Sequence, residues 1–332
     1  MKHINNASTP RRHRKYLPIG IVLCIGIVLG WYGIVRLISP WTVVKSITLD
    51  LAQPESSGQT LQELRVGCYN IAHGRGGRFG ASEWEGGNRA TKIARMKQIA
   101  HLFKTARLDI VVLNEVDFSS VWSGHVDQAR IIAQEGGYPY LVEQRNLDMA
   151  IPFVSVRFGN AILSKYPIIE TTFLDYPNPS EVIELFTGGF KEGVVGTIQL
   201  PDTSQIQVVA VHLCVSSEPI RVASARQILA HQHQSALPLL AMGDFNTAPR
   251  GYPQFYEDED GKNAIEVLVA SQHLTTRPQG LPLEPEDLTF PSEHPDRVID
   301  WIFISPPWTI QEHTVLSSDL SDHLPVTALL TR

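Results

Sequence analysis

A run of apolar residues that stops abruptly at polar side chains places the strongest constraint on this chain. Leu240-Ala-Met-Gly-Asp-Phe-Asn246 predicts a buried strand whose end carries a carboxylate, Asp244, and an amide, Asn246. Asp and Asn are poor strand formers, and a buried carboxylate without a partner is costly. An ordinary turn is the alternative interpretation of these residues. The same pattern recurs at other strand ends, and this recurrence favours a functional site.

The part of the chain around this segment alternates between short apolar strands and helices. Apolar or β-branched runs predict strands at 64–69, 110–113, 160–164, 193–200, 206–211, 239–242, 298–304 and 326–330. Helical spacing of apolar residues predicts helices at 89–105, 127–134, 218–234 and 263–271. Several strands follow one another without a crossover helix, which indicates antiparallel pairing. We therefore expect an α/β fold, a four-layer α/β/β/α sandwich of two mostly antiparallel sheets.

The N-terminal region differs in composition from the rest. A basic cluster in residues 1–15 precedes an uncharged run of 20 residues, 16–35, which matches a bilayer core of ~30 Å. We predict a transmembrane helix as a retained anchor over 16–39, a linker over 40–62 and one folded domain over 63–332. A cleavable signal peptide is the alternative, although its apolar core is usually only ~7–15 residues long. The basic cluster predicts a cytoplasmic N-terminus and an extracytoplasmic domain.

The charge of the chain is divided unevenly. Residues 1–45 hold 7 of the 28 Lys and Arg residues and no acid. The remaining residues carry 21 basic against 34 acidic side chains, a net charge of −13. A domain this acidic repels the phosphate backbone of nucleic acids unless a bound cation intervenes. The balance argues against a general nucleic-acid-binding protein.

Chemically active side chains stand at further strand ends. They are Asn70, Glu115, His212, Asp300, Asp322 and His323. Each alone has an ordinary explanation as a turn residue, a surface acid or a buried histidine whose ring nitrogens are hydrogen-bonded. Binding sites collect at one edge of a rigid sheet, where loops meet. We therefore expect these side chains to converge.

The blocks that carry these residues resemble, in their order, the endonuclease/exonuclease/phosphatase superfamily of DNase I-like phosphodiesterases and phosphatases. The blocks are Asn70, Asn114-Glu115-Val-Asp117, Gly159-Asn160-Ala-Ile-Leu-Ser164, Val211-His212-Leu213, Gly243-Asp244-Phe-Asn246, Asp300 and Ser321-Asp322-His323. The resemblance covers residue 63 to the C-terminus. The segment from Thr289 to Phe303 is similar to a subgroup of small bacterial hydrolases, related to membrane-associated enzymes of GPI-lipid remodelling.

The resemblance implies a role for each residue. Three are expected to hold Mg²⁺ or Mn²⁺, and hard oxygen ligands suit such ions: Asn70, Glu115 and Asp322. Five are expected to be catalytic: His323 as a phosphate ligand or acid–base group, Asp300 as its orienting partner, Asp244 for the attacking water, Asn246 for the phosphate oxygens and His212 for the developing negative charge. Asn160 is expected to support the site from its strand.

One motif departs from the family. Many nucleases of the superfamily carry another acid shortly after the first-strand Asn, whereas this chain has Asn70-Ile-Ala-His-Gly74. His73 either substitutes in part for that acid, contacts the substrate or is only a turn residue. The glycine-rich segment 74–80 lacks the Lys-Ser/Thr ending of a P-loop. We expect it to form a rim whose Arg75 and Arg78 meet an anionic substrate.

These observations favour a monomeric, membrane-anchored, metal-dependent hydrolase of a phosphate ester. Acidity and an anchor favour a lipid-linked or other small ester as the substrate. A metal-dependent nuclease that acts on extracytoplasmic DNA or RNA is the first alternative. A catalytically inactive scaffold of the same fold is the second.

Overall fold

The computed structural model of the chain describes residues 17–38, 43–53, 61–151, 154–178, 191–253, 255–278 and 283–332, which contain two β-sheets. One sheet consists of β1 (Val43–Thr48), β2 (Glu63–Asn70), β3 (Ile110–Asp117), β4 (Tyr140–Ile151), β5 (Val154–Ser164), β11 (Thr309–Val315) and β12 (Val326–Thr331). The other consists of β6 (Ile168–Asp175), β7 (Glu192–Gln199), β8 (Gln205–His212), β9 (Leu239–Asp244) and β10 (Asp300–Ile304).

Most neighbouring strands in both sheets run antiparallel, as predicted. The orders are β1-β4-β5-β3-β2-β12-β11 and β10-β9-β8-β7-β6. Only β2 with β3 and β8 with β9 pair in parallel among the described strands. The partners in a parallel pair end at the same edge of the sheet. Each parallel pair therefore brings two strand ends together, and the packing of the sheets brings the two pairs together, since Asn70 Nδ2 at the end of β2 lies 3.0 Å from Asp244 Oδ2 at the end of β9.

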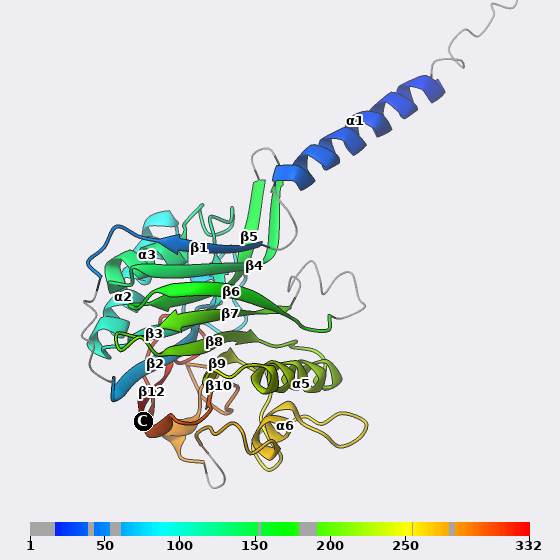
Figure 1. Cartoon of the computed structure of the whole chain (residues 1–332). Helices are drawn as coiled ribbons and strands as arrows, with labels where there is room; N and C mark the ends of the chain where they lie inside the picture. Colours follow the sequence, from blue (N-terminus) through cyan, green and yellow to red (C-terminus); the bar gives the residue numbers. More distant parts are fainter. Residues whose placement is uncertain are drawn as a thin grey trace, which may run out of the picture.

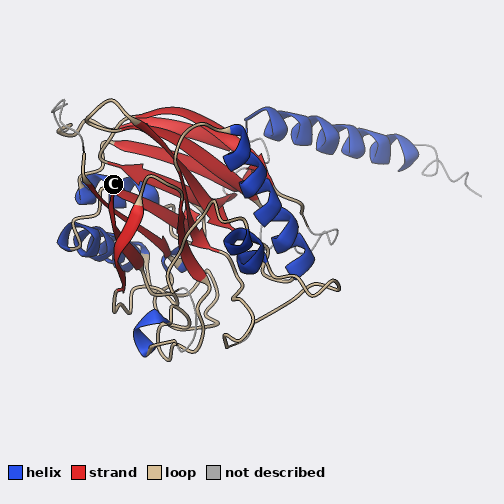
Figure 2. Ribbon diagram, turned by 60° about the horizontal axis from the view of Figure 1, so that its bottom comes forward, coloured by secondary structure: helices blue, strands red, loops and turns tan. Residues whose placement is uncertain are grey.

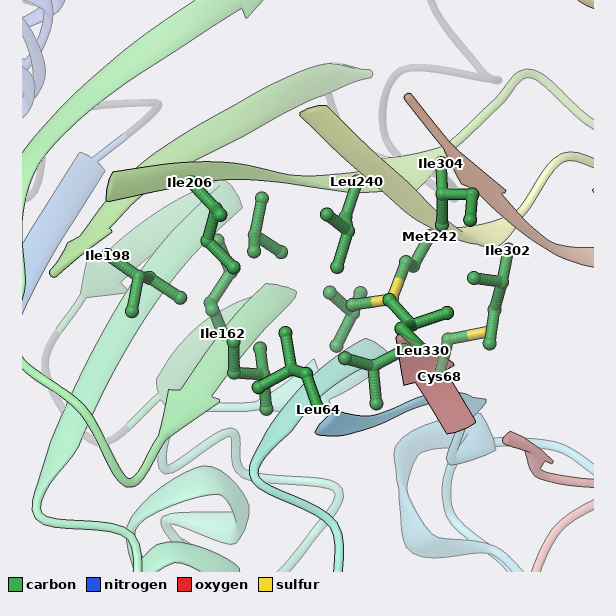
Figure 3. Packing of buried hydrophobic residues seen from close by; sticks show 14 of the residues in the cluster. Leu64, Cys68, Ile162, Ile198, Ile206, Leu240, Met242, Ile302, Ile304 and Leu330 are labelled. Carbon is green, nitrogen blue, oxygen red and sulfur yellow. The ribbon is translucent and has the colours of Figure 1, made fainter. Parts of the chain in front are cut away.

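The two sheets pack face to face around an apolar interior. Residues such as Leu64 and Ile162 of one sheet meet Leu240 and Ile302 of the other, and all four are fully buried (Figure 3). Burial of one such side chain stabilises the fold by roughly 1.5–3 kcal/mol. This interior holds the sheets in a fixed relation, which a site built from both of them requires.

Helices cover the outer face of each sheet (Figure 2). Apolar side chains of α2 (Arg89–Thr105) and α3 (Gln128–Gly136) pack on the larger sheet, and those of α5 (Glu218–Gln234) and α6 (Ala264–Ala270) pack on the smaller one. The predicted four-layer α/β/β/α sandwich is confirmed. The predicted bounds of α2 and α5 agree with the structure to the residue.

The N-terminal helix α1 (Leu17–Ile38) runs away from the sandwich (Figure 1). Within the part of the chain that the structure describes, no helix is both long and apolar enough to cross a membrane. The transmembrane helix predicted for 16–39 is therefore not confirmed. The basic tail predicted for 1–15 lies outside the described residues.

The predicted linker over 40–62 contains a strand of the larger sheet. β1 pairs antiparallel with β4, with Val43 opposite Arg145 and Thr48 opposite Tyr140. The side chains of β1 are mostly exposed or half-buried, so the segment shows no apolar pattern. It is a strand because of its backbone bonds to β4. Residues 39–42 and 54–60 of this region lie outside the described residues.

Three further strands, β4, β6 and β11, were not predicted. β6 and β11 carry mostly exposed side chains and lie at or next to sheet edges. β4 is buried but polar, because Arg145 pairs at 2.6 Å with both Glu143 and Asp148. These ion-paired charged residues interrupt the apolar pattern from which a strand is predicted.

Candidate active site

The predicted side chains meet at the edge of the sandwich where the parallel strands end. Asn70, His212 and Asp244 are the last residues of β2, β8 and β9. Asp300 begins β10 directly opposite Asp244. Six predicted residues line one cleft of about 420 Å³: Glu115, His212, Asp244, Asn246, Asp322 and His323. The expected convergence is confirmed.

A β-bulge directs Glu115 into this cleft. The register between β3 and β5 shifts between Leu113 and Val116, and Glu115 has a φ of 51°. Bulges of this kind re-aim a side chain out of the regular alternation of a strand. The Glu115 side chain is 22% exposed. It is therefore accessible from the cleft, in contrast to its apolar neighbours in β3.

Asn70 connects the two acids of the site. Its Nδ2 donates to Glu115 Oε1 at 3.2 Å and to Asp244 Oδ2 at 3.0 Å. Its Oδ1 accepts from the backbone N–H of Ala72 at 3.0 Å. The amide oxygen is the atom that would bind a metal ion, and here it is engaged by the backbone. In this arrangement Asn70 orients the two carboxylates.

Asn160 supports the site through Asn114. Asn114 Nδ2 donates to Asn160 Oδ1 at 2.8 Å and to Val211 O at 2.9 Å, and Asn114 Oδ1 accepts from Asp244 N at 3.0 Å. A side chain at Gly243 would not fit here, since its Cβ would lie 2.0 Å from Val211 O. The buried amide of Asn114 thus links the two sheets directly beneath Asp244.

His323 lies between two acids. Its Nδ1 is 2.9 Å from Asp300 Oδ2, and its Nε2 is 3.8 Å from Asp244 Oδ2. Burial by itself lowers the pKa of His323, but the pair with Asp300 raises it to about 10. Burial raises the pKa of Asp244 to about 7, and the positive charge of His323 offsets part of this increase. The geometry suits proton transfer, with a cationic imidazole beside a carboxyl group that binds its proton more tightly than usual.

His212 faces the same acids from β8. Its Nε2 lies 3.9 Å from Glu115 Oε1 and 3.8 Å from Asp244 Oδ2. Burial and the ammonium group of Lys191, which lies 3.4 Å from His212 Nε2, hold the pKa of His212 well below its ordinary value. A neutral imidazole that donates one hydrogen bond fits this environment. Lys191 gave no signal in the sequence, because no recognisable motif surrounds it.

Asn246 and Asp322 are held by neighbouring groups. Asn246 Nδ2 donates to Leu213 O at 3.1 Å, and its backbone N–H donates to Asp244 Oδ1 at 2.8 Å. Asp322 Oδ2 accepts from Arg75 at 2.9 Å. The sequence placed Arg75 on a rim that meets substrate, whereas the structure pairs it with an acid that we expected to bind metal.

The donor set fits a divalent cation. Ligand atoms of Asp244, Asp300 and His323 lie within 4.8 Å of one another, the one such group of three acids and histidines among the described residues, but protonated His323 has no free ring nitrogen for a metal ion, so this group offers carboxylate oxygens only. Glu115 adds a carboxylate nearby, linked to Asp244 through Asn70. Carboxylate oxygens suit Mg²⁺ and Mn²⁺. A larger cavity of about 810 Å³ next to α6 contains none of the predicted residues.

Known proteins share this architecture. The model of the endonuclease/exonuclease/phosphatase family matches residues 67–323. No curated protein matches the chain. An endonuclease/exonuclease/phosphatase from Beutenbergia cavernae is 20% identical over 82% of this chain and 72% of its own, with a TM-score of 0.55.

Two further solved structures have the same fold. A mannosyl-6-phosphatase of Bacteroides thetaiotaomicron is 17% identical over 81% of this chain and all of its own, with a TM-score of 0.56. The catalytic domain of human Nocturnin, solved with bound sulfate, is 15% identical over 87% of this chain and 96% of its own, with a TM-score of 0.56. The family match covers most of the folded domain, and the fold and the cleft agree with it. The chain therefore belongs to the endonuclease/exonuclease/phosphatase family and is a hydrolase of phosphoric esters.

Proposed function

We propose that the protein uses Mg²⁺ or Mn²⁺ to hydrolyse a phosphodiester of a small or lipid-linked compound. The observation that carries this proposal is the convergence of Glu115, Asp244 and His323 in one cleft. The net charge of −13 outside residues 1–45 favours a small ester over a nucleic-acid duplex.

Each side chain of the cleft has a separate role in the proposed reaction. Asp244 takes the proton of the attacking water, and its raised pKa suits a general base near neutral pH. Protonated His323, held by Asp300, binds the phosphate and counters its charge. Neutral His212 and the second amide hydrogen of Asn246 donate to the phosphate oxygens as negative charge develops.

A metal ion adds charge neutralisation on the phosphate when it is bound. Glu115 is the residue that would hold it, with further ligands from Asp322 and Asn70 after these side chains turn from Arg75 and Ala72. The roles of Asp322 and Asn70 stay predictions. The support for Glu115 is its partial exposure to the cleft and its orientation by Asn70.

A substrate panel tests the proposal. The purified chain is expected to cleave bis-p-nitrophenyl phosphate with Mg²⁺ or Mn²⁺, and EDTA is expected to abolish the reaction. Glu115→Ala and His323→Ala are each expected to lower kcat/KM by ~100-fold or more. Release of a phospholipid head group supports a lipid-linked substrate, whereas plasmid nicking supports a nuclease. Absence of turnover with every ester supports a scaffold.

The location of the domain beyond a membrane, and the monomeric state, also stay predictions. A C-terminal alkaline phosphatase fusion is expected to be active only if the domain is exported. Sedimentation of the purified chain tests the oligomeric state.

A further inference from the structure

A buried histidine outside the predicted catalytic set faces Glu115. His73 lies in the turn that follows β2, is 7% exposed and lines the cleft. Its φ of 53° is in the left-handed region, where a residue with a side chain is strained by roughly 1–3 kcal/mol. A residue that served only to form the turn would not have to be a buried histidine in a strained backbone conformation.

Several contacts fix the ring of His73. Its Nδ1 is 2.9 Å from Asp117 Oδ1, and the second oxygen of Asp117 accepts from Trp122 Nε1 at 2.8 Å. Gln128 Nε2 donates to the backbone oxygen of His73 at 2.7 Å. A carboxylate only accepts hydrogen bonds, so Nδ1 carries the hydrogen. The other ring nitrogen, Nε2, is therefore the atom presented to Glu115.

His73 Nε2 and Glu115 Oε2 are 3.6 Å apart. This separation is longer than a hydrogen bond. It fits two atoms that share one divalent ion, since each would lie ~2.0–2.2 Å from the ion. A histidine that donates one ring N–H to a carboxylate and offers the other nitrogen to a metal is the usual arrangement in metalloproteins. Asp117, His73 and Glu115 reproduce this arrangement.

We propose that His73 Nε2 and Glu115 form a mixed nitrogen–oxygen pair of metal ligands, and that this pair gives the site a preference for Mn²⁺ over Mg²⁺. Imidazole nitrogen suits transition ions, whereas Mg²⁺ takes oxygen ligands. The inference rests on the proposed metal-dependent function and deepens it by naming a ligand and the preferred ion.

The test uses the full chain loaded with MnCl₂. Pulsed EPR is expected to show coupling of Mn²⁺ to imidazole ¹⁴N in the wild type. His73→Asn is the informative variant, because its amide can still donate to Asp117 and Asn tolerates the left-handed backbone. It lacks the second ring nitrogen, so the ¹⁴N coupling should disappear. Titration calorimetry should show Mn²⁺ affinity falling ~10-fold or more and Mg²⁺ affinity changing by less than ~3-fold.

His212→Asn is the matched control, since it removes a second histidine near Glu115 and should keep the coupling. Absence of ¹⁴N coupling in the wild type, or its survival in His73→Asn, overturns the inference. Equal losses of Mn²⁺ and Mg²⁺ affinity also overturn it, because a residue that only positions Glu115 would weaken both ions alike. If circular dichroism shows that His73→Asn is misfolded, the other two proteins still test the inference, because it is overturned if the wild type lacks the ¹⁴N coupling or if His212→Asn loses it.

Hydrolysis is measured separately. Nitrogen-coupled Mn²⁺ without cleavage of any ester would contradict the proposed function alone. Cleavage without nitrogen coupling would contradict this inference alone.

Discussion

Replacement of Asp300 by Asn tests whether the charge of the Asp300–His323 pair is used in catalysis. The two side chains are buried and 2.9 Å apart, and the pKa of His323 is raised from 6.5 to about 10. A carboxylate neighbour raises such a pKa by ~1–3 units, at ~1.36 kcal/mol per unit. If Asp300 accounts for ~3 pKa units at this buried pair, His323 should titrate near pH ~7 in Asp300→Asn. The loss of the carboxylate then destabilises the protonated imidazole by ~4 kcal/mol.

This shift predicts a particular pH dependence. At pH 8 the protonated fraction of His323 falls from ~99% to ~10%, and at pH 9 from ~90% to ~1%. The ratio of wild-type to variant kcat/KM should therefore increase from pH 7 to pH 9 by a factor of ~50, on top of a constant loss from poorer orientation of the ring. Because the folded pKa is raised, the pair stabilises the fold below pH 6.5 and loses this effect as the pH rises through about 10.

Two measurements check the reasoning. NMR titration of the metal-free protein reports the pKa of His323 directly, and hydrolysis of bis-p-nitrophenyl phosphate gives the rate ratio. Asp260→Asn is the control, since it makes the same chemical change at an exposed loop acid. A rate ratio that stays constant between pH 7 and pH 9, or an unchanged His323 titration in Asp300→Asn, would refute the argument.

Three further predictions concern metal removal and stability. EDTA followed by Mn²⁺ should abolish and then restore hydrolysis in the wild type, whereas Glu115→Gln should stay below ~1% activity at any Mn²⁺ concentration; recovery of Glu115→Gln would contradict its role as ligand. Asn114→Ala should lower the free energy of unfolding in urea by ~3 kcal/mol or more, because it leaves three buried partners unpaired. The control Asn88→Ala, which removes an exposed helix cap, should lower it by only ~1 kcal/mol. Similar losses in the two variants would show that the link between the sheets is weak. Burial and Asp175 raise the pKa of Glu192 to about 7, so stability is lost as the pH rises from 4.5 through 7. Glu192→Gln should therefore stabilise the protein by ~1 kcal/mol at pH 8 and hardly at all at pH 4.5. An equal change in the free energy of unfolding at both pH values would contradict the raised pKa.

Local signals were sufficient for the helices and the apolar strands. Asn88 caps α2 through its bond to Thr91 N, and a proline follows the first residue of α5. These signals are contained in a few neighbouring residues. β1 and β4 were missed because their pairing with each other, and the ion pairs of Arg145, depend on residues that propensity does not take into account.

The site residues were predictable as a set, whereas their contacts were not. The sequence identified Asn70, Glu115, Asp244 and His323, and all of them lie at the predicted edge. It did not show that Asn70 turns its nitrogen to the acids or that Arg75 pairs with Asp322. It also left the role of His73 open between a partial substitute for the missing acid, a substrate contact and a turn residue.

The sequence by itself determined which chemical groups stand at the strand ends, because polar residues after apolar runs are visible without knowledge of the fold. Only the tertiary structure decided how these groups meet. Asn70 and Asp244 are 174 positions apart, and Arg75 and Asp322 are 247 apart. Such contacts depend on the register of the strands and the packing of one sheet on the other, and neither is encoded in any short segment of the chain.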